Sequence, residues 1–196
     1  MAELSDDQLR EFLCTRVRPA VLEHYSPNSC LATTKVALEV LRAAGIPARP
    51  WPCSLLVANS AAAPLYLQVM TDGEIAEAVA AGAHAVEVMG HGTTDKGWDG
   101  HMVAIAQFSD APHLLDLSLD QARRSTWSIN VGPAAIPLWA DTDTAELPIW
   151  GWVGDAMVRW APLKDTSWRS APDWRLNDLT APIAGVLIRE LRELVR

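Results

Sequence analysis

The stretch "SPNSCLATTKVALEVLRAAGIPARP", residues 26–50, places a cysteine where a turn becomes a helix. Apolar residues recur at helical spacing through residues 30–44, and only a narrow strip of that segment is polar. Gly45 and Pro47 then stop the pattern, as residues at and beyond a helix C-terminus commonly do. The stretch therefore predicts a largely buried helix with Cys30 near its start.

How far Cys30 lies from the start of this helix depends on which residue is the N-cap. With Asn28 or Ser29 as N-cap, Cys30 lies in the first turn, where unpaired backbone N–H groups and the positive end of the helix dipole favour a thiolate. The same N–H groups could hold an oxyanion. With Ser26 as N-cap, Cys30 lies one turn deeper and is less activated. The sequence leaves both registrations open, and most free cysteines are simply small core residues.

The rest of the chain mixes helical and strand patterns. We expect helices over 5–24, 71–82 and 179–196, and strands over 48–58, 84–90, 101–108 and 113–119, with a Gly-rich loop over 90–100. The last two strands flank a short polar turn and so predict an antiparallel hairpin. Asp120–Gln121 reads as a turn. Seven of the nine tryptophans fall in residues 123–196, which indicates a second layer or a wrap around the core.

Composition and charge exclude several classes of protein. The 196 residues are 49% hydrophobic and 20% charged, which is typical of a soluble globular chain. A net charge of −8 without a Lys/Arg cluster argues against nucleic-acid and anionic-membrane partners. No apolar run approaches the roughly 18 residues of a membrane span, and the acidic N-terminus is unlike a secretory signal, so we expect a cytoplasmic location.

The cysteine count and spacing argue against disulfides and metal. Cys14, Cys30 and Cys53 are an odd number without a CxxC pair, which disfavours a disulfide framework and a zinc site. We expect Cys14 and Cys53 to be core residues. A ligand set built from Cys30 and several histidines has no supporting spacing such as HExxH, so no metal and no cofactor are expected.

A thiolate nucleophile needs a base, and the base needs an orienting group. His101 is the best candidate of the five histidines, because it lies at the mouth of a strand just after the Gly-rich loop. A hairpin centred near Ser109–Asp110 puts residue 101 opposite residues 116–118, so His101 and Asp116 can be neighbours on one face. His113, three residues from Asp116, points to the other face. His91 and Asp95 are more typical of exposed loop residues than of a substrate groove.

Three segments in this order resemble the transglutaminase-like branch of the papain-like cysteine-enzyme superfamily: "CLATTKVALEVLRAAGIPAR" (30–49), "GWDGHMVAIA" (97–106) and "LLDLSLDQ" (114–121). The resemblance covers roughly residues 26–122. It implies an α+β fold in which the cysteine-bearing helix packs on an antiparallel sheet. It also implies a Cys30–His101–Asp116 triad, with residues 1–122 as the catalytic core and the Trp-rich extension and terminal helix, 123–196, completing the same domain.

The implied chemistry is acyl transfer from an amide of a peptide or protein through a thioester on Cys30, by a peptidase, amidase, deamidase or transglutaminase. Whether water or an amine accepts the acyl group stays open, as does the oligomeric state. His24, Tyr25 and Asn28 are candidates for the side-chain half of an oxyanion hole or for substrate contacts. The alternative is a catalytically inactive transglutaminase-like fold that binds a protein through its cleft or its Trp-rich face.

Overall fold

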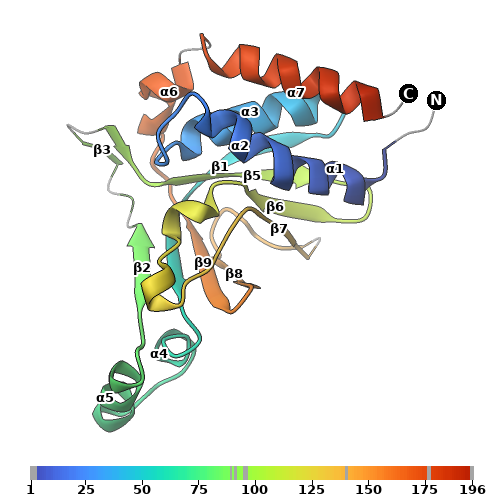
Figure 1. The fold of residues 1–196 in the computed structure, drawn as a ribbon. Coiled ribbons are helices and arrows are strands. Elements are labelled where there is room, and N and C mark those ends of the chain that lie inside the picture. Colours follow the sequence, from blue (N-terminus) through green and yellow to red (C-terminus); the bar gives the residue numbers. More distant parts are fainter. Residues whose placement is uncertain are drawn as a thin grey trace.

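A layer of helices covers one face of an antiparallel sheet in the computed structural model of the chain (Figure 1). The structure describes residues 4–88, 90, 92–94, 97–139, 141–175 and 178–194. The α+β class predicted from the sequence is confirmed. Among the described residues, none of the helices is both long and apolar enough to span a bilayer.

The main sheet is built around β1, an 11-residue strand that pairs on both of its edges. The strands run in the order β7-β6-β5-β1-β9-β8, and β2 pairs with the distal half of β1. A Cβ on Gly151 of β8 would lie 3.7 Å from the side chain of Ile136 on β7, so the two edges approach each other and the sheet nearly closes. The strand bounds are β1 Ala48–Ala58, β2 Ala85–Val88, β5 His101–Gln107, β6 Pro112–Asp116, β7 Ala134–Pro137, β8 Ile149–Val153 and β9 Ala156–Pro162.

The helical layer begins with one continuous run in place of the single regular helix predicted over 5–24. It consists of α1 (Asp6–Phe12), a π-helical turn (Leu13–Val17) and α2 (Arg18–Leu22). Pro19 explains the wide turn, because a proline has no N–H for an α-helical bond and its ring clashes with the preceding turn. The layer is completed by α3 (Cys30–Ala43) and α7 (Thr180–Leu194), which pack against each other.

The strand β5 separates two apolar cores because its side chains alternate between faces. Ala104 and Ala106 pack against the helical layer. Val103 and Ile105 point into the nearly closed sheet, where they meet the buried Trp160 of β9. Strands formed by residues 123–180 thus share a sheet and an inner core with β1 and β5.

Two expectations about residues 90–119 are wrong. Residues 90–100 are not all loop, since β3 (Gly92–Thr94) and β4 (Gly97–Asp99) form a small hairpin whose three-residue strands are too short to show alternation. The strand expected over 113–119 ends at Asp116, because the Asp116 carboxylate accepts a hydrogen bond from the backbone N–H of Ser118 and turns the chain. His91 and Asp95 lie outside the described residues.

An arm formed by the distal part of β1, the helices α4 (Pro64–Leu67) and α5 (Asp72–Ala80), and β2 projects from the body (Figure 1, bottom). The Asn59 side chain stabilises the base of this arm through four hydrogen bonds. The Asn59 side-chain oxygen accepts from the backbone N–H groups of Ala62 and His84, and the amide group donates to the carbonyls of Gly82 and Trp127. None of the residues of α5 is buried.

Candidate active site

Cys30 is the first residue of α3. Ser29 is the N-cap, and the first backbone bond of the helix runs from the Thr33 N–H to the Ser29 carbonyl at 2.9 Å. Of the two registrations left open by the sequence, the structure has the one that starts at Ser29. The backbone N–H of Cys30 therefore precedes the first intrahelical bond.

The Cys30 side chain is 8% exposed and lies in an apolar cluster with Leu31, Met102 and Trp168. Its Sγ is 3.9 Å from the carbonyl oxygen of Gly100, the residue directly before His101. The Thr34 hydroxyl donates to the Met102 carbonyl at 2.9 Å, which joins α3 to the start of β5 beside the same histidine.

His101 and Asp116 form a buried pair. His101 is the first residue of β5 and Asp116 is the last residue of β6, and His101 Nε2 lies 2.8 Å from Asp116 Oδ2. The register pairs Ala104 with Leu115, which puts residue 101 across from residue 118 and Asp116 two positions away on the same face. The geometry of the hairpin is thus the one expected from its turn.

Asp116 has further partners that the sequence does not suggest. The indole N–H of Trp160 donates to the same Oδ2 atom at 2.8 Å, and the backbone N–H of Ser118 donates to Oδ1 at 3.2 Å. Asp116 and Trp160 are both fully buried. A buried carboxylate with three hydrogen-bond partners is fixed in place, and these bonds offset the free-energy cost of burying it.

The environment of His101 favours the charged imidazolium. Burial lowers the pKa of His101, but the charge of Asp116 and its hydrogen bond, with smaller contributions from Cys30, outweigh it and raise the pKa to about 10. His101 is engaged by Asp116 through Nε2, and a hydrogen bond with the Cys30 side chain adds to the stabilisation of the charged ring. The structure thus brings Cys30, His101 and Asp116 together.

Of the other two cysteines, Cys53 lies in a core as expected, and Cys14 packs against one. Cys53 is fully buried on β1 opposite His101, and burial raises the pKa of its thiol well above the usual value. Cys14 is half-buried against the helical core, and burial raises the pKa of its thiol to about 11. Both thiols are therefore poor nucleophiles near neutral pH.

The three residues expected as oxyanion or substrate contacts are not part of the cluster around Cys30. His24 and Asn28 are exposed on the segment between α2 and α3. Tyr25 is half-buried and packs against the helical core. A donor that the sequence did not single out is Trp168, which packs in the Cys30 cluster and whose buried indole N–H has no hydrogen-bond partner among the described residues.

Trp98 is a second tryptophan of this cluster. Its indole N–H donates to Asp165 Oδ2 at 2.8 Å. Its ring covers Gly100 so closely that a Cβ there would lie 2.4 Å from a ring atom. The pKa of Asp165 is lowered, chiefly by the hydrogen bond from the Ser167 hydroxyl, so the acceptor that anchors the Trp98 ring is a carboxylate at neutral pH.

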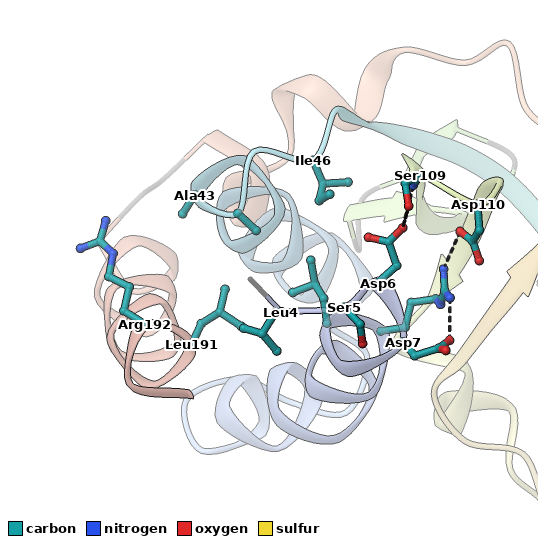
Figure 2. Close-up of a pocket in the computed structure, with 13 residues that line it drawn as sticks. Leu4, Ser5, Asp6, Asp7, Ala43, Ile46, Ser109, Asp110, Leu191 and Arg192 are labelled. Atoms are coloured by element: carbon teal, nitrogen blue, oxygen red, sulfur yellow. Dashed lines mark hydrogen bonds and ion pairs between the residues drawn. The ribbon is translucent and has the colours of Figure 1, made fainter. Parts of the chain in front are cut away.

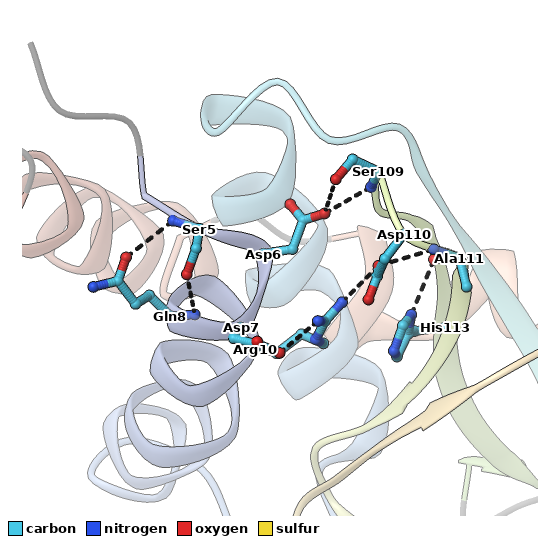
Figure 3. A network of polar contacts seen from close by, with 9 residues as sticks. All are labelled: Ser5, Asp6, Asp7, Gln8, Arg10, Ser109, Asp110, Ala111 and His113. Atoms are coloured by element: carbon cyan, nitrogen blue, oxygen red, sulfur yellow. Dashed lines mark hydrogen bonds and ion pairs between the residues drawn. The ribbon is translucent and has the colours of Figure 1, made fainter.

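A hollow of about 790 Å³ lies elsewhere, between the start of α1, the end of α3 and the end of α7 (Figure 2). Its central charged groups are already paired, since Arg10 bonds Asp7 at 2.6 Å and Asp110 at 2.9 Å, while Asp6 accepts from Ser109 (Figure 3). These bonds fasten α1 to the β5–β6 turn, which gives the hollow a structural role.

The arrangement at Cys30 combines a thiol at a helix start, an imidazolium and a buried carboxylate, which are the groups required for thiol-mediated acyl transfer. Among the described residues, no group of His, Cys, Asp and Glu side chains is placed to hold a metal ion. Comparison of the chain with protein-family models, curated proteins and solved structures found no match in any of the three.

Proposed function

We propose that the protein is a cysteine-nucleophile hydrolase or acyltransferase of the transglutaminase-like, papain-like kind, acting on an amide of a peptide or protein. The observation that carries the proposal is one connected chain of side chains. Asp116 bonds His101, His101 faces Cys30, and Cys30 stands at the N-terminus of α3. Nucleophile, base and orienting group come from three separate elements that meet at one point.

In the first half of the reaction, the Cys30 thiolate attacks the amide carbonyl carbon. A C–S bond forms and the carbonyl electrons move to oxygen. As the intermediate collapses, the C–N bond breaks and the His101 imidazolium gives its proton to the departing amine. The products are a free amine, a thioester on Cys30 and a neutral imidazole.

In the second half, water or an amine attacks the thioester carbonyl. Neutral His101 accepts the proton of the attacking group, the C–S bond breaks, and the thiolate and the imidazolium are restored. Asp116 keeps its hydrogen bond to the ring throughout and stabilises the imidazolium. Water gives a peptidase, amidase or deamidase, and an amine gives a transglutaminase-type transfer.

The developing oxyanion needs hydrogen-bond donors that point at it before the reaction begins. The backbone N–H of Cys30 is such a donor, because it lies ahead of the first intrahelical bond of α3. The indole N–H of Trp168, which has no partner in the described part of the chain, is the best available side-chain donor in the same cluster. The replacement Trp168→Phe keeps an aromatic six-membered ring and removes this N–H together with the rest of the five-membered ring.

The proposal is tested by the rate at which iodoacetamide alkylates Cys30 as a function of pH, read by peptide mass. Cys14 and Cys53 serve as controls within the same molecule. We expect Cys30 to react fast and almost independently of pH from about pH 6 to 8, and to lose this behaviour in His101→Ala. A rate that rises only near about pH 8.5, with no effect of His101→Ala, would contradict the proposal.

Acyl transfer itself is tested with p-nitrophenyl acetate as the probe. Intact mass should show one acetyl group on the wild-type chain, located on Cys30 and absent from Cys30→Ser. The acetyl-enzyme is then followed in buffer with and without a primary amine. Transfer of the acetyl group to the amine indicates a transferase, and its release as acetate indicates a hydrolase.

One observation favours the alternative of a protein-binding module. Large apolar side chains are exposed on the Trp-rich third, with Trp139 84% and Trp152 55% exposed, while Cys30 is nearly covered. The same alkylation experiment separates the two functions. An ordinary thiol profile together with no acetylation of Cys30 supports the binding module.

A further inference from the structure

Arg18 is a buried cation. The helical pattern of the sequence does not predict its burial, and it is not a member of the triad. Its side chain is 3% exposed, although it begins α2 next to Pro19. The extra residue of the π-helical turn brings both Val17 and Arg18 to the buried side of the helical run. A buried arginine is stable only if its donors are satisfied.

All of the Arg18 nitrogens donate hydrogen bonds. Nε and Nη2 form a two-bond contact with Asp120 at 2.8 Å and 3.2 Å. Nη1 donates to the hydroxyls of Ser29 at 3.0 Å and Thr33 at 3.1 Å, and Nη2 also donates to the Pro27 carbonyl at 2.6 Å. The rigid planar fork of an arginine suits such a set of acceptors, and a lysine cannot reproduce it.

These acceptors belong to the two halves of the site. Pro27, Ser29 and Thr33 form the loop and the first turn that carry Cys30. Asp120 lies in the short 3-10 helix, Leu119–Ala122, four residues after Asp116. One guanidinium group therefore ties the backbone around the thiol to the segment that carries the His101 partner.

The contact with Ser29 also affects the start of α3. A serine at the N-cap normally accepts a hydrogen bond from the N–H of the second or third helical residue. Ser29 makes no such side-chain cap, and its hydroxyl instead accepts from Arg18. The N–H groups at the start of α3, beside Cys30, are thus left uncapped by Ser29.

We propose that Arg18 is the positioning residue of Cys30: it holds the Cys30 turn in register with the His101–Asp116 pair and keeps Ser29 from capping the helix. This inference rests on the proposed function of the triad. Arg18 acts through position, because the bidentate contact with Asp120 neutralises its charge.

The test is the pH profile of Cys30 alkylation in Arg18→Met and Arg18→Lys. Arg16→Met is the matched control, since Arg16 lies two residues away, is 54% exposed and pairs with Glu190 outside the site. We expect both Arg18 variants to alkylate about tenfold more slowly near pH 6.5, because small displacements of reacting groups cost on the order of 10- to 100-fold. Their profiles should move toward that of a free thiol, and Arg16→Met should match the wild type.

Two milder variants keep the inference testable if the Arg18 variants do not fold. Thr33→Val removes one acceptor on the Cys30 side, and Asp120→Asn weakens the contact on the Asp116 side. Each should shift the profile in the same direction by a smaller amount. Folded variants with the wild-type profile would overturn the role of Arg18 while the wild type still depends on His101. If instead His101→Ala leaves the pH profile of Cys30 alkylation unchanged, the proposed function itself is overturned.

Discussion

Trp160 and Asp116 are joined by a 2.8 Å hydrogen bond between two side chains that are both fully buried. The bond reaches the same carboxylate oxygen that accepts from His101. Trp160 lies on β9, whereas the histidine and the aspartate lie on β5 and β6. The orientation of the candidate catalytic pair therefore depends on a strand from the far side of the nearly closed sheet.

Replacing Trp160 by phenylalanine should weaken the fold and the site together. A smaller aromatic ring remains, but Asp116 loses one of its three partners, and a buried group left short of a hydrogen bond costs about 1–3 kcal/mol. The lost part of the indole leaves a void in the core that adds to this cost. We expect that loss in the unfolding free energy measured with urea, and slower alkylation of Cys30. Trp152→Phe is the control, because Trp152 is exposed on β8. Equal stability of the two variants would contradict a role for the Trp160 N–H.

The charge state of His101 should depend on Asp116. In the wild type, the ring stays protonated through neutral pH, since its pKa is raised to about 10. In Asp116→Asn the charge that raises this pKa is gone and burial dominates, so the ring should be neutral at pH 7. Nitrogen-15 NMR of the imidazole distinguishes the two states directly. A ring that titrates near its ordinary pKa of about 6.5 in both proteins would contradict this.

The same pKa has a consequence for stability. A folded-state pKa above the unfolded value of about 6.5 means that protonated His101 stabilises the fold fully below that pH, and that the contribution is lost as the pH rises toward about 10. Cys30→Ala serves as the background, because it leaves the His101–Asp116 pair without the neighbouring thiol. The unfolding free energy of Cys30→Ala should fall relative to that of Cys30→Ala/Asp116→Asn between pH 7 and pH 10, and a constant difference would contradict it.

Gly100 should tolerate no side chain. A Cβ at this position would lie 2.4 Å from the Trp98 ring, which Asp165 holds in place. Gly100→Ala should therefore lower the unfolding free energy by about 1–3 kcal/mol, the usual cost of overpacking. Gly73→Ala is the control of opposite sign. It lies in α5, where a new Cβ would be 4.0 Å from the Thr71 hydroxyl, an ordinary contact distance, and alanine there should stabilise by about 0.5–1 kcal/mol.

Asn59 should control the motion of the arm. Asn59→Ala removes the side-chain partner of the His84 N–H and of the Gly82 and Trp127 carbonyls, at a cost of about 2 kcal/mol or more, while the Ala62 N–H keeps its bond to the Asn59 carbonyl. Amide hydrogen exchange should accelerate over the segment from α4 to β2 and stay unchanged in α3. Exchange that accelerates throughout the chain would show that the arm does not open as a separate unit.

The sequence revealed those parts of the site that leave a local pattern. Cys30 stands where a turn meets a buried helix, and the His101–Asp116 distance follows from the symmetry of a hairpin about its turn. Trp160 and Arg18 leave no such pattern. Their partners are 44 and 102 residues away, and a tryptophan among apolar residues reads as a core filler. The small β3–β4 hairpin cannot be predicted for a different reason. Three-residue strands bounded by glycine are too short to show an alternation of apolar and polar residues.

The central position of β1 also bears on the order in which the chain can fold during synthesis. Cys53 of β1 pairs with His101 on one edge and with Pro162 on the other, so the sheet cannot be completed until the ribosome has released residues more than a hundred positions downstream. Non-local pairing of this kind is slow. A nascent chain that has delivered only β1, β5 and β6 holds the thiol, the imidazole and the carboxylate, but Asp116 still lacks the indole of Trp160. The proposed nucleophile and base therefore lack their final support until Trp160 has emerged and β9 has joined the sheet.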